Sequence, residues 1–304
     1  MNKRTSNILI YLISSIAIAV IYFFAGKLGL SLAYLNESAS PVWFSSGIAV
    51  VVMVLFGYRF LPSIFIGAFL VNFTTTPSIP VSIGIAIGNT LEAGIAGYLI
   101  NRFAGGKEVF IKTKTAWKFF FIAIVAPIIS ALIGISSLIY GNYLDKNQAF
   151  SVGLTWWIGD VMGIIILFTL ILALYHKVPV HIKKKRYLEL TISFVILISL
   201  SLIIFTGWPI EINRTFHLAF LCFLPILWIA FRSCLRFTAI ATFITSIIAI
   251  YGTIMKLSIF DVPAINGSLI ILQIYIGAMT ITSMMISICV IEYKNKINKQ
   301  KRKH

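Results

Sequence analysis

Long apolar runs separated by short polar stretches constrain this chain more than any other feature. Hydrophobic residues make up 59% of its 304 residues and charged residues only 11%, whereas an average soluble domain is about 25% charged. A helix of about 20 apolar residues crosses the hydrocarbon core of a bilayer. The sequence therefore predicts an all-α protein, a polytopic integral membrane helix bundle. The ten expected spans are roughly 8–25, 41–57, 60–75, 79–100, 118–140, 150–175, 188–206, 216–231, 237–255 and 268–291.

Ten transmembrane helices is the predicted count, and eight is the alternative because the runs 41–57 and 60–75 are short for a full crossing. Between these two runs, Gly57 suits the end of one helix and Pro62 the first turn of the next. The sequence therefore predicts a tight helical hairpin here. Small residues four apart, such as Gly84 and Gly88, predict close contacts between helix backbones.

The positive charge indicates an orientation in the membrane. The net charge is +16, and all but four of the 25 Lys and Arg residues fall on one side of the predicted spans. Cytoplasmic loops are enriched in Lys and Arg, so both termini are expected inside the cytoplasmic membrane of the cell. The charge is thus explained by topology and by contact with anionic lipid, and nucleic acid is not an expected partner. The four exceptions are Lys27, Lys146, Arg214 and Lys256.

Two carboxylates lie inside otherwise uncharged apolar segments. Asp160 precedes a run without charge from Val161 to Leu174, and Glu92 lies within 81–101. An ionisable group at membrane depth is costly and marks a functional site by default. Asn89 lies three residues before Glu92 and Trp156 four residues before Asp160, so each pair shares a helix face. Asp160 is therefore expected to be shielded from lipid.

These acids define a candidate ligand-binding site. Asp160 and Glu92 would supply polar contacts. Three tryptophans would form apolar walls, and two asparagines would supply hydrogen bonds. An alternative is that the acids are neutral or hydrogen-bonded and only hold helices together. The tryptophans have an alternative too, since aromatic residues gather at membrane interfaces. The candidate ligand-binding residues are Asp160, Glu92, Trp156, Trp157, Asn89, Asn72 and Trp43.

Catalytic and metal-binding signatures are not found in the sequence. No two histidines form a ligand pair on a helix face, and neither H-E-x-x-H nor a P-loop occurs. Cys222, Cys234 and Cys289 lack the spacing of a disulfide framework or a metal site. An aspartyl membrane protease would need two facing acids, but neither acid lies in a motif known to us for that chemistry. We expect no enzyme, no cofactor and no metal.

Several blocks of residues occur in a recognisable order along the chain. They are Pro41–Ala49, Phe56–Pro62, Ile66–Asn72, Gly88–Ala93, Trp156–Gly163, and Pro225 with Trp228, Ala230 and Arg232. These blocks resemble the first membrane-associated sensor domain, MASE-one, in the family's order, and the resemblance extends from about residue 8 to residue 292. It implies a bacterial multi-spanning sensory input module, usually joined at its C-terminus to a histidine kinase, a diguanylate cyclase or a phosphodiesterase.

This chain departs from the family pattern at its C-terminus. Residues 1–292 form the expected membrane-embedded sensory bundle, and residues 293–304 form a basic cytoplasmic tail too short for an output domain. The chain is therefore expected to be either a stand-alone sensor with a separate signalling partner or a truncated protein.

The function predicted from the sequence is sensing. A small molecule or ion would bind within the bundle, and the signal would leave through span 268–291 to a cytoplasmic partner of kinase or cyclase type. The other expected partners are the lipid bilayer and a second copy of the chain in a homodimer. The alternative function is a secondary transporter, or a transporter-like substrate-binding subunit, that uses Glu92 and Asp160.

Overall fold

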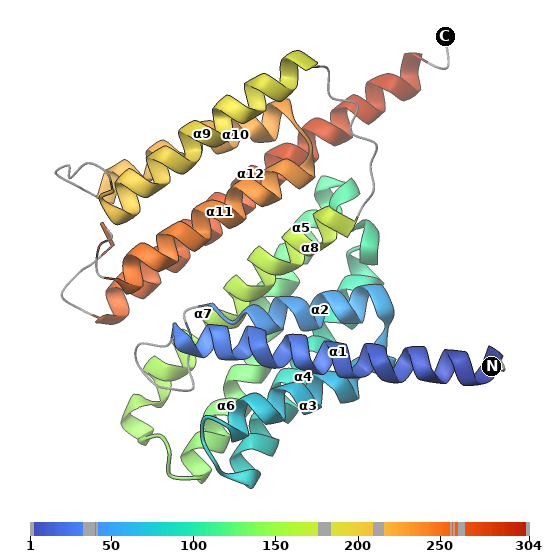
Figure 1. The fold of residues 1–304 in the computed structure, drawn as a ribbon, viewed down its shortest axis with the longest axis vertical. Coiled ribbons are helices and arrows are strands. Elements are labelled where there is room, and N and C mark those ends of the chain that lie inside the picture. Colours follow the sequence, from blue (N-terminus) through green and yellow to red (C-terminus); the bar gives the residue numbers. More distant parts are fainter. Residues whose placement is uncertain are drawn as a thin grey trace. The chain divides into compact units, whose positions relative to one another are not determined.

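The protein is helical throughout the part of the chain that its computed structural model describes (Figure 1). That part comprises residues 3–32, 40, 42–175, 184–208, 216–255, 257, 259–260 and 265–301. Within it, seven helices are long and apolar enough to cross a membrane, and three more are shorter and apolar. All ten coincide with the runs recognised in the sequence. The prediction of an all-α polytopic helix bundle is confirmed.

The chain forms two compact units. The first unit consists of Met1–Lys107 and Phe121–Ile164, and the second unit of Glu108–Phe120 and Ile165–His304. The chain passes between them three times: after Lys107, within helix α5 (Thr113–Val125), and at the segment Ile164–Phe168, which is a π-helix. A π-helical turn inside a long helix is rare and is frequently found near functional sites.

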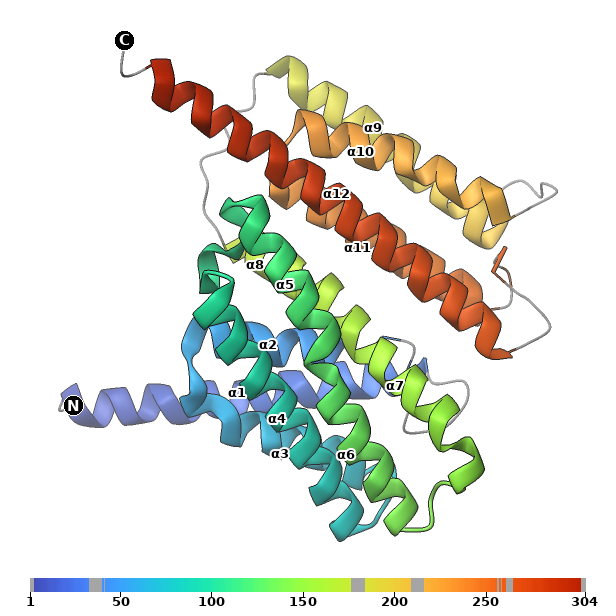
Figure 2. The same ribbon diagram turned by 180° about the vertical axis from the view of Figure 1, so that it is seen from behind.

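Helix α4 lies at the centre of the first unit and packs against α2, α3 and α6 (Figures 1 and 2). Helix α1 packs on α2 and α3, while α7 packs on α2 and α6. Helix α4 is therefore surrounded both by helices that precede it in the sequence and by a helix that follows it. The helices are α1 (Lys3–Ser31), α2 (Phe44–Phe56), α3 (Leu61–Phe73), α4 (Ile79–Phe103), α6 (Pro127–Tyr140) and α7 (Ala149–Gly163).

The predicted end of α2 at Gly57 and start of α3 at Pro62 are confirmed, but the two helices do not pack on each other as a tight hairpin; each packs instead on α1 and α4. Gly57 follows α2 with φ of 86°, a left-handed conformation that glycine adopts without strain. A short 3₁₀-helix, Tyr58–Phe60, leads directly into α3, whose first turn contains Pro62. Because proline lacks the amide hydrogen that a first helical turn leaves unpaired anyway, it begins this helix without loss of a hydrogen bond.

Small residues bring the helices of the first unit into close contact, as predicted. A Cβ atom added to Gly67 would lie 2.9 Å from the carbonyl oxygen of Ala19 on α1. At Gly97 the added atom would be 2.5 Å from the Cβ of Met53 on α2, and at Gly88 3.2 Å from that of Ile133 on α6. Even a methyl group would push these helices apart.

The second unit has an aromatic interior. Phe119 of α5 stacks on Phe168 with ring centroids 4.6 Å apart, and Phe205 stacks on Phe260 at 5.7 Å. Helices α9, α10, α11 and α12 pack side by side (Figure 2). The elements are α8 (Thr169–Tyr175), α9 (Lys184–Thr206), the 3₁₀-helix η5 (Phe216–Cys222), α10 (Phe223–Arg232), α11 (Leu235–Ile254) and α12 (Ile265–Lys301).

Helix α12 continues well beyond its apolar part. It is 37 residues long and extends to Lys301, so most of the basic tail that begins at residue 293 belongs to the same helix. A continuous helix of this kind transmits a displacement along its axis without a flexible joint.

Candidate functional site: a buried acidic cluster

Asp160 is buried within the first unit, with no exposed surface. Its burial, predicted from the cost of a charge facing lipid, is confirmed. One carboxylate oxygen, Oδ1, accepts a hydrogen bond of 3.0 Å from the Ser46 hydroxyl of α2. The other oxygen, Oδ2, has no hydrogen-bond partner among the described residues. Asp160 is therefore only half satisfied by its surroundings.

The backbone around Asp160 is fixed by contact with the start of α2. The amide of Trp43 donates a hydrogen bond of 2.9 Å to the carbonyl oxygen of Gly159. One turn further along α7, an added Cβ at Gly163 would collide with the carbonyl group of Trp43. The lack of a side chain at Gly163 thus lets the N-terminus of α2 lie directly on α7, which brings Ser46 to the carboxylate.

Glu92 of α4 lies beside Asp160 and is equally buried, at 1% exposure. The two carboxylates interact electrostatically, and Ser46 and Ser130 face Glu92. Neither carboxylate oxygen of Glu92 has a hydrogen-bond partner in the described part of the chain. No ion pair with a described Lys, Arg or His neutralises either acid. The structure thus brings together the two intramembrane acids that the sequence singled out.

A chain of hydrogen bonds borders the acids and joins four helices. The amide nitrogen of Asn89 donates to the Tyr22 hydroxyl of α1 at 3.1 Å. The amide oxygen of Asn89 accepts a 2.7 Å bond from Ser130 of α6, and the indole nitrogen of Trp156 donates to the same Ser130 oxygen at 3.2 Å. Helices α1, α4, α6 and α7 each contribute one residue to this chain. A displacement of one of these side chains would therefore break a hydrogen bond to a neighbouring helix.

A small cavity adjoins Asp160. Its volume is about 10 Å³, and Ser40, Trp43, Asn72, Trp156 and Asp160 line it. A single water molecule needs roughly 10–15 Å³ of such space. The cavity is therefore just large enough for one water molecule or one small ion beside the Asp160 side chain, and a larger ligand would require the surrounding helices to separate.

Six of the seven predicted site residues belong to this cluster or border it, and Trp157 does neither. The indole nitrogen of Trp157 donates to the carbonyl oxygen of Ile124 at 2.7 Å, and its ring borders an apolar groove with Phe150. Neighbours on a helix are about 100° apart, so Trp156 and Trp157 point in different directions. Asn72 faces the cavity, but its amide nitrogen donates to Ala68 of its own helix.

Sequence reasoning missed four polar residues of the cluster. Ser46 and Ser130 contact the acids or their partners, Tyr22 ends the hydrogen-bond chain, and Ser40 lines the cavity. Hydroxyl groups are common in membrane helices, where most bond to their own backbone. Among the described residues many serines do so, including Ser136 and Ser137 on α6. Only the packing of α2 on α7 and of α6 on α4 distinguishes Ser46 and Ser130 from them.

The fold and this cluster define a class: a multi-pass membrane protein with an acidic centre among its helices. The MASE1 family model matches residues 14–294, nearly the whole chain. The chain belongs to the MASE1 family of membrane-associated sensor domains. Comparison with curated proteins and with solved structures gave no match.

Proposed function

We propose that this membrane sensory module binds a small molecule or ion at the Glu92–Asp160 cluster and relays the event to a cytoplasmic partner of kinase or cyclase type. One observation carries the proposal. Two carboxylates are buried together, and three of their four oxygens have no hydrogen-bond partner among the described residues. Buried polar groups are normally satisfied, and an unpaired buried charge costs several kcal/mol. Such a cost is expected where the acids serve a ligand.

Charge and space favour a small cationic ligand. The cluster offers carboxylate and hydroxyl oxygens, and the adjoining cavity has the volume of a water molecule. Among the described residues no group of three or more His, Cys, Asp and Glu side chains could hold a metal ion. A proton or a monovalent cation fits these conditions better than a transition metal or a bulky metabolite, and catalysis forms no part of the proposal.

The route of the signal is proposed to run through α5 and α6 to α12. Ser130 of the cluster is on α6, which follows α5 along the chain after a break at Ala126 and Pro127. At the start of α5, the amide and hydroxyl of Thr113 donate bonds of 2.9 and 3.0 Å to the Glu292 carboxylate of α12. A shift of α5 would thereby reach the helix that leads to Lys301.

A ligand-induced change in thermal stability tests the binding site. Wild type and Asp160→Asn are reconstituted in lipid nanodiscs and melted across a series of monovalent cations, pH values and small metabolites. We expect at least one condition to raise the melting temperature of wild type and leave Asp160→Asn unchanged. Asp145→Asn is the matched control, because Asp145 is exposed and outside the cluster. Equal responses of wild type and Asp160→Asn would contradict the proposal.

A secondary transporter remains the second candidate because paired buried acids are also typical of ion pathways. Uptake into proteoliposomes distinguishes the two functions. A sensor is expected to show no accumulation of solute under an imposed proton or cation gradient. Accumulation that is lost in Asp160→Asn would favour the transporter and contradict a purely sensory role.

A further inference from the structure

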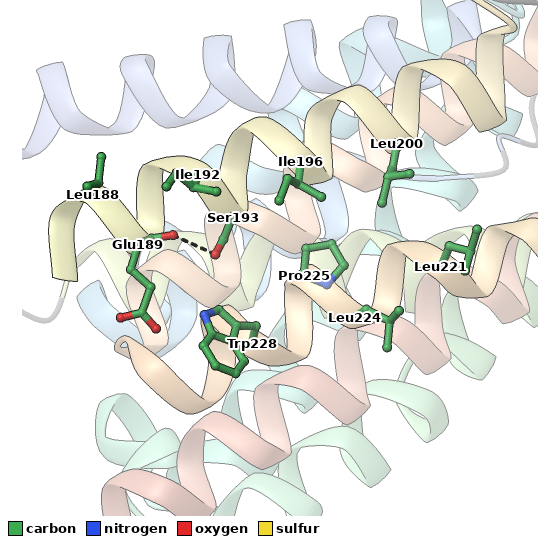
Figure 3. A pocket seen from close by; sticks show the side chains of 10 residues that line it. All are labelled: Leu188, Glu189, Ile192, Ser193, Ile196, Leu200, Leu221, Leu224, Pro225 and Trp228. Atoms are coloured by element: carbon green, nitrogen blue, oxygen red, sulfur yellow. Dashed lines mark hydrogen bonds between the residues drawn. The ribbon is translucent and has the colours of Figure 1, made fainter. Parts of the chain in front are cut away.

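An apolar groove runs between α9 and the η5–α10 segment of the second unit (Figure 3). Its volume is about 670 Å³. One wall is a stripe of residues four apart on α9, which therefore share a face: Leu188, Ile192, Ile196 and Leu200. Leu224 and Trp228 of α10 stand opposite this stripe. The stripe is substantially exposed, with Leu188 at 65% and Ile192 at 50%.

One end of the groove is charged, and positive charge dominates there. Arg232 holds Glu189 in a two-point ion pair, with nitrogen to oxygen distances of 2.7 and 3.1 Å. Arg186 acts electrostatically on Glu189, and Lys294 of α12 lies near both Arg186 and Arg232. Arg232 alone contacts Glu189, and Arg186 and Lys294 interact electrostatically with this pair, so three positive charges accompany one carboxylate at this end. The N-terminal turns of α9 are at the same end, where the helix dipole also favours an anion.

The length of the groove matches one leaflet of a bilayer. Leu188 and Leu200 are twelve residues apart on α9, which corresponds to about 18 Å along the helix axis. Half of a hydrocarbon core of about 30 Å is roughly 15 Å. Trp228 lies beside the charged end, 5.7 Å from the Arg232 guanidinium, and tryptophan is enriched where a membrane meets water. An acyl chain would fill the groove from the interface inward.

We infer that this groove is a binding site for an anionic phospholipid. Its phosphate group would lie at Arg186, Arg232 and Lys294, and one acyl chain would lie between α9 and α10. Charge complementarity selects an anionic over a zwitterionic headgroup, because Glu189 neutralises only one of the three cations. Arg232 is 43% exposed in its side chain and still has N–H groups to donate to a phosphate. The site does not depend on the acidic cluster of the first unit.

Retention of lipid in native mass spectrometry tests the inference. The full chain is reconstituted in nanodiscs of equal parts phosphatidylglycerol and phosphatidylcholine and then released. Wild type is expected to keep one phosphatidylglycerol in preference to phosphatidylcholine. Arg232→Gln should lower that preference about fivefold, because one cation near an anionic surface contributes about 1 kcal/mol to lipid binding. Lys118→Gln makes the same charge change at an exposed site on α5 and should leave the preference unchanged.

A second pair of variants tests the apolar part without changing charge. Ile196→Trp fills the groove and should reduce retention of the bound lipid, whereas Val195→Trp, on an exposed position outside the groove, should not. Melting curves establish that each variant is folded. Equal retention of the two phospholipids by wild type, or a lipid-free dimer in their place, would overturn the inference. Retention unaffected by both Arg232→Gln and Ile196→Trp would also overturn it.

Discussion

The two units treat their acidic side chains in opposite ways. In the first unit, Glu92 and Asp160 are fully buried and largely unpartnered among the described residues. In the second unit, the described acids are at least partly exposed, and two of them have partners: Glu189 pairs with Arg232, and Glu292 accepts from Thr113 and pairs with Lys296 at 3.1 Å. A carboxylate that stabilises a fold has its oxygens satisfied. The comparison therefore supports the proposal that Glu92 and Asp160 serve a ligand, whereas Glu189 and Glu292 stabilise the fold.

The interiors of the two units also differ in polarity. Aromatic stacking fills the second unit, as in the Phe119–Phe168 and Phe205–Phe260 pairs. The first unit instead places a hydrogen-bond chain next to its acids, from Tyr22 through Asn89 and Ser130 to Trp156. Such networks have few equivalent arrangements, because each group loses a partner when a neighbour moves. A ligand at the acids is thus expected to change the first unit more than the second.

The largest expected effect comes from disturbing the backbone contact beneath Asp160. Gly163→Ala should destabilise the first unit by about 1–3 kcal/mol, because the methyl group would collide with the Trp43 carbonyl. Gly153→Ala on the same helix is the control. Its Cβ would be 3.4 Å from the nearest atom, so the change should be neutral or stabilising. Thermal unfolding in detergent measures both, and equal stabilities would refute the packing of α2 on α7.

Removal of the central hydroxyl of the network should have the next largest effect. Ser130→Ala leaves the Trp156 indole and the Asn89 amide oxygen short of a partner, with an expected cost of about 1–3 kcal/mol. Ser136→Ala removes an exposed hydroxyl from the same helix and should change stability by less than about 0.5 kcal/mol. The difference between the two unfolding free energies isolates the network. No difference would mean that Ser130 is not a buried junction.

A smaller effect is expected at the start of α5, where Glu292 of α12 accepts hydrogen bonds from Thr113. Glu292→Gln weakens the acceptor for Thr113 and the pairing with Lys296, and should lower the melting temperature by less than Ser130→Ala does. Spin labels at Tyr293 would also report a loss of any ligand-induced movement of α12. Glu108→Gln, at an exposed acid of the same unit, should retain that movement. If Glu292→Gln retains it as well, the proposed route through α5 is wrong.

The smallest effect concerns the two adjacent tryptophans. Trp157→Phe should leave the ligand response unchanged, because this ring is outside the acidic cluster. Trp156→Phe removes the donor to Ser130 and should weaken the response. A dose-response comparison of the two variants in nanodiscs measures the difference. A greater loss in Trp157→Phe would place the ligand on the outer side of α7 and contradict the site.

Hydropathy and glycine spacing were sufficient to predict the helices, the boundary between α2 and α3 and the burial of Asp160, but not that α2 and α3 pack on α1 and α4 rather than on each other. These features depend on local composition, or on the cost of a charge in lipid, which a sequence displays directly. The roles of Ser46, Ser130 and Tyr22 depend on which helix faces which, and their residue types are common in any membrane helix. The same limit explains Trp157, since a rotation of one residue about α7 decides whether a tryptophan faces α6 and α4 or turns away.

The central claim is that Glu92 and Asp160 are kept for a ligand at a cost to stability. The most direct measurement is the unfolding of the double variant Glu92→Gln/Asp160→Asn in nanodiscs, with and without the condition that stabilises wild type. The double variant is expected to melt above the unliganded wild type and to show no further rise with ligand, because neutral amides are cheaper to bury than unpaired carboxylates. A variant that is less stable than wild type and still responds to the ligand would contradict it.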